Sequence, residues 1–118
     1  MREMVIPTNG VKLRESLDKL LGTFVKRSKV QIIQSSAGLA ATCVTSLSNT
    51  SKTNKKKLIL CHGYGAGSGL FYKNFDALAD HYDVYALDWP GFGISVRNKR
   101  NIPYVRGIDT ILQKAAKA

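Results

Sequence analysis

Apolar residues recur at three- and four-residue intervals across residues 11–25, which predicts an amphipathic helix. Thr8 or Asn9 stands where an N-terminal cap would be placed. We expect this helix to pack against a domain, and the alternative is a basic helix that lies on a membrane surface. The apolar positions are Val11, Leu13, Leu17, Leu20, Leu21 and Phe24.

The spacing then changes to one typical of strands. Val30, Ile32 and Ile33 are β-branched, residues 35–38 are turn-forming, and residues 42–47 are again β-prone, which together predict a β-hairpin. Residues 48–57 contain no apolar side chain and are expected to form a surface loop.

The central stretch, residues 58–95, predicts a strand, a helix and a second strand. Residues 58–61 and 84–87 are short apolar runs, as expected of strands covered on both faces. Ser68 is a candidate N-cap for the helix between them, and a unit this compact is expected to be a right-handed parallel crossover. The apolar stripe of that helix is Phe71, Phe75, Leu78, Ala79 and Tyr82.

Beyond residue 98 the pattern predicts one short C-terminal helix and no further buried strand. We therefore expect a parallel sheet edge that stays exposed. The helix would carry Ile108, Ile111, Leu112 and Ala115.

The composition favours one small intracellular domain. The chain has 118 residues, 44% of them hydrophobic. No apolar run approaches the ~20 residues of a membrane-spanning helix, and the first residues lack a secretory signal. Cys43 and Cys61 have no metal-binding spacing, which favours reduced thiols over a disulfide. We expect the protein to be cytoplasmic or peripheral to a membrane, and not secreted.

The net charge of +10 lies in the flanks of the chain, because residues 63–96 carry one lysine against four aspartates. Basic flanks attract anionic lipid or nucleic acid, although a solvated surface is the favoured interpretation. The lysines near residue 55 have no interleaved aromatic residues, so no nucleic-acid partner is expected.

The glycine-rich segment at residues 62–69 follows a predicted strand, where backbone N–H groups can approach a ligand. The dinucleotide fingerprint Gly-x-Gly-x-x-Gly fails in every register, and a phosphate loop fails because no Gly-Lys pair is present. His62 has no metal-binding partners, since His81 lies at the far end of the predicted helix. We therefore expect neither a cofactor nor a metal.

Two motifs in this stretch resemble signatures of the α/β-hydrolases. Residues 62–65 are similar to that family's His-Gly-x-Gly, and residues 88–95 are similar to its Asp-x-x-Gly-x-Gly-x-Ser. Residues 62–97 look most like the branch that contains lysophosphatidic acid acyltransferases, lipase coactivators and phospholipases. The resemblance covers about Lys29 to Arg97.

The resemblance implies a role for each residue of the two motifs. Tyr64 would offer its main-chain N–H to a developing oxyanion, Gly63 and Gly65 would permit the tight turn, and the His62 side chain would brace it. In the second motif Asp88 would fix the loop and would not be the triad acid. The remaining residues, which we assign to the structure of that loop, are Gly91, Gly93 and Ser95.

The departures from the family concern its catalytic groups. No Gly-x-Ser-x-Gly pentapeptide occurs in the chain, and no His-x-x-x-x-Asp acyltransferase motif begins at either histidine. In the family, the catalytic histidine and acid follow later in the sequence.

We therefore expect an α/β fold with an incomplete hydrolase sheet: an N-terminal helix, a hairpin, one βαβ unit and a short C-terminal helix. Residues 1–28 would form the helical segment and residues 29–118 a domain truncated before the nucleophile. The chain alone would be inactive, while its full-length parent would act on lipid acyl esters, with a membrane or lipid-droplet surface as a possible partner. The alternative is a non-catalytic protein that binds a lipid surface or another protein; a nucleotide-binding βαβ module is a third hypothesis.

Overall fold

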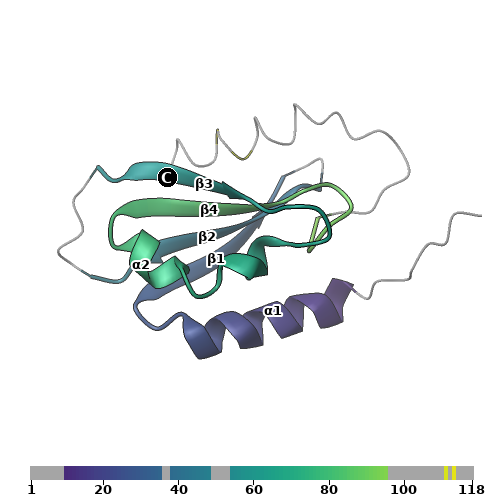
Figure 1. Ribbon diagram of the computed structural model, residues 1–118, viewed down its shortest axis with the longest axis horizontal. Helices are drawn as coiled ribbons and strands as arrows, with labels where there is room; N and C mark the ends of the chain where they lie inside the picture. The colour runs from purple at the N-terminus through teal and green to yellow at the C-terminus, as the bar shows by residue number, and fades with distance from the viewer. Residues whose placement is uncertain (1–9, 36–37, 49–53, 96–110, 112, 114–118) are drawn as a thin grey trace, which may run out of the picture.

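The computed structural model describes residues 10–35, 38–48, 54–95, 111 and 113, and within them a four-stranded sheet with helices on one face (Figure 1). The elements are α1 (Gly10–Phe24), β1 (Ser28–Gln34), β2 (Ala40–Ser46), β3 (Lys56–Cys61), the 3-10 helix η1 (Ser68–Phe71), α2 (Phe75–Ala79) and β4 (Tyr82–Asp88).

The α/β architecture expected from the sequence is confirmed. The predicted N-terminal helix agrees with α1 to within one residue at each end. Its candidate caps, Thr8 and Asn9, lie outside the described residues. Of the predicted C-terminal helix only Ile111 and Gln113 are described, and both are helical.

The strands follow the order β1-β2-β4-β3. β1 and β2 form the predicted hairpin, with Val30 opposite Val44. β3 and β4 are parallel, with Leu60 opposite Ala86, as the crossover requires. The antiparallel pairing of β2 with β4 joins the hairpin to the crossover in one sheet.

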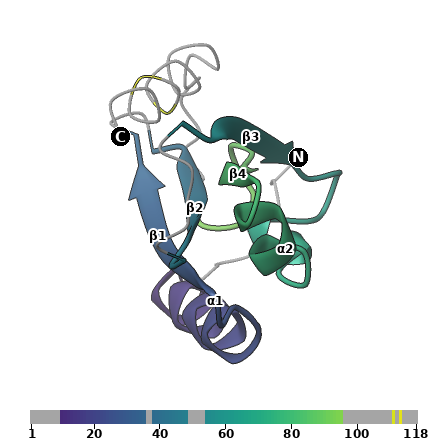
Figure 2. The same cartoon turned by 90° about the vertical axis from the view of Figure 1, so that its left-hand side faces the viewer.

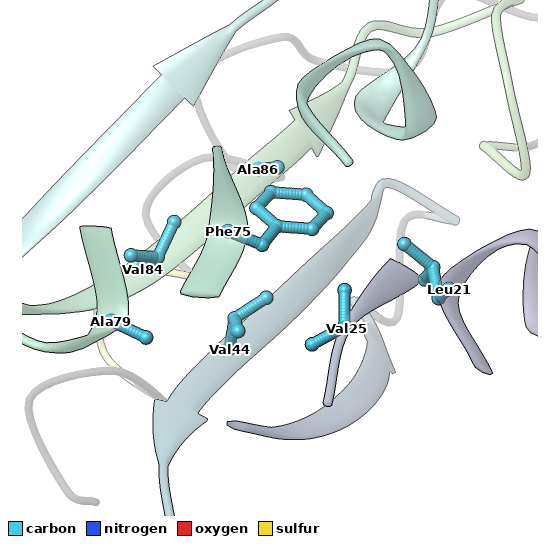
Figure 3. Packing of buried hydrophobic residues seen from close by; sticks show 7 residues of the cluster. All are labelled: Leu21, Val25, Val44, Phe75, Ala79, Val84 and Ala86. Carbon is cyan, nitrogen blue, oxygen red and sulfur yellow. The ribbon is translucent and has the colours of Figure 1, made fainter. Parts of the chain in front are cut away.

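Both faces of the sheet bury apolar side chains, because successive residues of a strand point to opposite sides. On one face α1 and α2 lie side by side against the strands (Figures 1 and 2). Figure 3 shows the seven buried residues that meet there, contributed by the helices, β2, β4 and the start of the α1–β1 connection: Leu21, Val25, Val44, Phe75, Ala79, Val84 and Ala86. The other face buries Leu39, Ala41, Leu87 and Ile111.

The expectation that residues 58–61 would be covered on both faces is wrong. Leu58 and Leu60 are half-buried, while Ile59 is 38% exposed and Cys61 is exposed. The strand order explains this, since β4 lies between β2 and β3 and leaves β3 as an outer strand of the described sheet (Figure 1). Residues 84–87 of β4 are all buried, as predicted.

The single helix predicted after Ser68 is also wrong. The segment divides into η1 and α2, and Tyr82 already belongs to β4. Ser68 is not a capping residue, because Gly67 precedes η1 and the N-cap makes no side-chain hydrogen bond. The Ser68 hydroxyl instead bonds Thr42 of β2 and Asp88 of β4.

Asp76 of α2 fixes the connection between α1 and β1. Its carboxylate accepts hydrogen bonds from the Lys26 N–H at 2.8 Å, the Arg27 N–H at 3.1 Å and the Ser28 hydroxyl at 2.7 Å. Desolvation raises the pKa of Asp76, but these bonds and the nearby Arg27 charge outweigh it and hold the pKa below its ordinary value. The end of α1 is therefore tied to the helix beside it.

Candidate functional site

The two sequence motifs meet at the carboxyl edge of the parallel strand pair. Cys61, the last residue of β3, lies opposite Leu87 of β4, so His62 and Asp88 follow at the same level of the sheet. This edge is where α/β sheets usually place their binding sites. Residues 62–65 and 88–95, which are separate in sequence, are therefore brought together at this edge as one candidate site.

The His62 side chain joins the two loops. It is 5% exposed, its Nε2 accepts a hydrogen bond from the Trp89 N–H at 3.1 Å, and its Nδ1 lies 2.7 Å from the Gly63 carbonyl oxygen. The Trp89 indole Nε1–H in turn donates to the His62 carbonyl at 2.9 Å. These contacts require a neutral imidazole with its proton on Nδ1, so both ring nitrogens are occupied by the backbone.

Residues 63–66 form a tight turn closed by the Ala66 N–H, which donates to the Gly63 carbonyl at 3.2 Å. Gly65 has a φ of +76°, which a glycine adopts without strain at the third position of a type II turn. Tyr64 occupies the second position, and its side chain is 99% exposed and packs edge-on against Phe92. Within the described part of the chain, nothing accepts a hydrogen bond from the Tyr64 N–H.

Asp88 organises the second loop from a buried position, at 2% exposure. Its carboxylate accepts from the Ser68 N–H at 2.6 Å, the Ser68 hydroxyl at 3.2 Å and the Ile94 N–H at 3.1 Å. Gly93 has a φ of +52°, and a Cβ built on it would overlap this carboxylate. Asp88 thus connects both loops, and Gly93 is the residue that leaves room for it.

Ser95 closes the second loop against the sheet. Its hydroxyl donates to the Asp88 carbonyl at 2.6 Å and accepts from the Ala40 N–H at 2.8 Å. Gly91 has a φ of +83° in the turn between them. Ser95 is 2% exposed, so its oxygen is held inside the loop and is not presented to a ligand.

Several residues of the candidate site were not assigned to it from the sequence, although Ser68 was considered as an N-cap. Ser68 is buried and bonds Asp88 as well as the Thr42 hydroxyl, at 3.1 Å. Trp89 and Phe92 pack around His62, with ring centroids 6.4 and 5.6 Å from it. Trp89 and Phe92 lie inside the quoted motif, which was the available signal, whereas no sequence feature points to the contact with Thr42.

A cleft of about 630 Å³ opens beside the turn, between α1 and the segment that follows β3. Gly65 and Ala66 of the turn form part of its wall. The opposite side of the cleft is lined by α1, through Leu13, Leu17 and Leu20. The sequence predicted that this face of the helix would be apolar, but it did not indicate which part of the protein the face would contact.

The described residues contain no assembled nucleophile and base. Both nitrogens of His62 bond to the backbone, and the exposed His81 lies edge-on to Tyr82. Ser68 and Ser95 bond Asp88 and the backbone, and neither contacts a histidine. In the same residues no three His, Cys, Asp or Glu side chains gather to hold a metal ion, and no helix is long and apolar enough to cross a membrane.

Part of this chain is similar in sequence to known proteins. A rice (Oryza sativa subsp. japonica) protein named as a probable 1-acylglycerol-3-phosphate O-acyltransferase is 38% identical over 77 residues, which are 65% of this chain and 18% of that protein. The human 1-acylglycerol-3-phosphate O-acyltransferase ABHD5 is 49% identical over 45 residues, 38% of this chain and 13% of that protein. The matched part is less than a fifth of either relative.

Known structures share the fold. A Bacillus subtilis naproxen esterase, carboxylesterase NP, superposes on 93% of this chain and 39% of its own with a TM-score of 0.67 at 16% identity. The sequence profile of the alpha/beta hydrolase fold matches residues 56–114, and thus extends past Arg97, where the resemblance was expected to end. With half of the chain matched by that profile and the sheet order in place, the chain belongs to the alpha/beta hydrolase fold family.

Proposed function

We propose that this chain supplies the oxyanion-binding part of a site for lipid acyl esters, of the lysophospholipid acyltransferase or phospholipase type. The observation that carries the proposal is the Tyr64 N–H, which lies at the carboxyl edge of the sheet in a turn braced by His62 and makes no bond to the described residues. A fixed backbone donor of this kind stabilises the negative charge that develops on an acyl carbonyl oxygen.

The nucleophile and base of such a site lie, in this proposal, outside residues 1–118. The sequence contains no Gly-x-Ser-x-Gly pentapeptide, and the two buried serines beside Asp88 are committed to hydrogen bonds. The chain would then be the N-terminal portion of a larger hydrolase and inactive by itself, because an oxyanion donor assists a nucleophile but does not replace it.

Lipid substrates are favoured by the relatives, whose names describe acyl transfer to 1-acylglycerol-3-phosphate. The test is a chimera in which the matching segment of this chain replaces that of the rice protein. We expect it to transfer acyl groups to lysophosphatidic acid above an empty-vector control. A soluble, folded chimera without acyl transfer would contradict the proposal.

The claim that the catalytic groups lie elsewhere is tested on the 118-residue chain itself. We expect no hydrolysis of p-nitrophenyl butyrate and no adduct with a fluorophosphonate probe, which labels activated serines. A probe adduct on Ser68 or Ser95, located by peptide mass spectrometry, would overturn this claim.

A non-catalytic role in binding a lipid surface or a partner protein is the second candidate, and the position of β3 favours it. Among the described strands β3 pairs on one side only, which leaves backbone groups for another strand. Sedimentation with anionic vesicles at low and high salt, together with size-exclusion chromatography, tests this role. No association in either assay would exclude it.

A further inference from the structure

The cleft beside the turn has a size and lining that suit a ligand. Its volume of about 630 Å³ falls within the range of roughly 300–1,000 Å³ that is usual for small-molecule sites. Two walls face each other, one from α1 and one from residues 65–70, and Phe92 and Ile94 of the second loop complete the lining.

The buried polar side chains of the lining are already bonded within the protein, and Ser16 adds one exposed hydroxyl from α1. The Asp88 carboxylate is satisfied by Ser68 and the Ile94 N–H, and the Ser68 hydroxyl also contacts Thr42. A sugar or nucleotide would lose many hydrogen bonds to water and regain few of them here. An alkyl chain loses none and removes apolar surface from water, so the lining favours a hydrocarbon ligand.

α1 is held in place as a wall of this cleft. Its end is tied to Asp76, Leu21 and Val25 belong to the core, and the Phe24 ring packs edge-on against Tyr72 at 4.6 Å. A Cβ on Gly69 would lie only 3.1 Å from Leu17 Cδ1, which shows how closely α1 approaches η1. The width of the cleft is therefore set by packing.

We propose that this cleft is the subsite for the fatty acyl chain and that α1 limits how much of the chain it accepts. The inference rests on the proposed function, because Gly65 lies both in the turn that presents the Tyr64 N–H and in the lining of the cleft. The cleft therefore begins at the residue that directly follows the proposed oxyanion donor.

The test is equilibrium binding of cis-parinaric acid, a fluorescent fatty acid, to the protein below the micellar concentration of the acid. We expect saturable binding that shorter saturated acids displace, with the affinity of these competitors rising about four-fold for each methylene that the cleft buries. The affinity should stop rising at the chain length that fills the cleft.

Variants on the two walls locate the binding. Ser16 is exposed and lines the cleft, so Ser16→Trp places bulk in it and should weaken binding about ten-fold or more. Val11 lies on the same helix, is 68% exposed and does not line the cleft, so Val11→Trp is the matched control and should change affinity less than about two-fold. Leu70→Gln tests the opposite wall at a side chain that is 63% exposed and costs little stability.

Circular dichroism of each variant separates lost binding from lost folding. Unchanged binding in folded Ser16→Trp and Leu70→Gln would overturn the proposal, as would binding to phosphatidylcholine vesicles without any binding of the free acid. The proposed function is tested apart from this: a chimera that fails to transfer acyl groups while the chain still binds the fatty acid would refute that function and leave the subsite standing.

Discussion

Gly93 allows the close approach between the second loop, residues 88–95, and the Asp88 carboxylate, and a substitution at this position tests that role. A Cβ at this residue would overlap the Asp88 carboxylate, and its φ of +52° is one that other residues rarely adopt. Gly93→Ala therefore carries two costs. The left-handed conformation alone costs about 1–2 kcal/mol.

The second cost arises because the Asp88 carboxylate must move. Its bonds to the Ser68 N–H and the Ile94 N–H would lengthen or break, and hydrogen bonds to a charged group contribute about 1.5–3 kcal/mol each. Because such losses are not additive, we expect Gly93→Ala to lower the free energy of unfolding by about 3–5 kcal/mol in total.

Gly91→Ala is the matched control for the backbone term. Gly91 lies in the same loop with a φ of +83°, but a Cβ there meets nothing within 4 Å. It should cost only the conformational term of about 1–2 kcal/mol. Urea unfolding followed by circular dichroism measures both variants, and equal losses for the two would refute the argument that Gly93 makes room for Asp88.

Two further predictions concern groups with shifted pKa values. Because the folded-state pKa of Asp76 lies below that of the unfolded chain, its carboxylate stabilises the fold above the unfolded value of about 4, and this contribution is lost as the pH falls through the folded pKa. The carboxylate titrates between about pH 5 and pH 2, so the free energy of unfolding should fall less over this range for Asp76→Asn than for the unmodified protein. Thermal unfolding at a series of pH values measures this difference, and identical pH profiles would contradict it. Partial burial raises the pKa of the half-buried Cys43 thiol to about 11. At pH 8 iodoacetamide should therefore alkylate the exposed Cys61 about ten times faster than Cys43 or more. Comparable rates for the two thiols, measured by peptide mass spectrometry, would count against the shielding of Cys43.

Much of the fold could be predicted from patterns among residues that are close in sequence. The apolar stripe of residues 11–25 located α1, and the β-branched residues around the turn-forming segment 35–38 located the hairpin, because both depend on neighbours in sequence. The parallel pairing of β3 with β4, which brings their carboxyl ends together, could be predicted because a compact strand–helix–strand unit has few alternative topologies.

The two wrong predictions, for the burial of residues 58–61 and for a single helix after Ser68, concern features that depend on residues distant in sequence. An apolar run such as residues 58–61 reads alike in a central strand and an edge strand, and only the pairing of β4 with β2 decides between them. The helix expected after Ser68 divides into η1 and α2, and the bond between the Ser68 N–H and Asp88, 20 positions later, is likewise one that local periodicity does not indicate. The two motifs were recognisable in the sequence, although their role in a site is still a prediction. The apolar cleft was not predicted, since it needs α1 to lie opposite residues 65–70.

The oxyanion claim is tested most directly by removing one backbone hydrogen. Tyr64 is the second residue of its turn, where proline is favoured, so Tyr64→Pro deletes the N–H while keeping the turn, and Tyr64→Ala keeps both. In the active chimera we predict that the proline variant loses about 100- to 1,000-fold in kcat for acyl transfer, whereas the alanine variant stays close to the parent. Equal kcat values for the two variants would contradict the assignment of the Tyr64 N–H as the oxyanion donor.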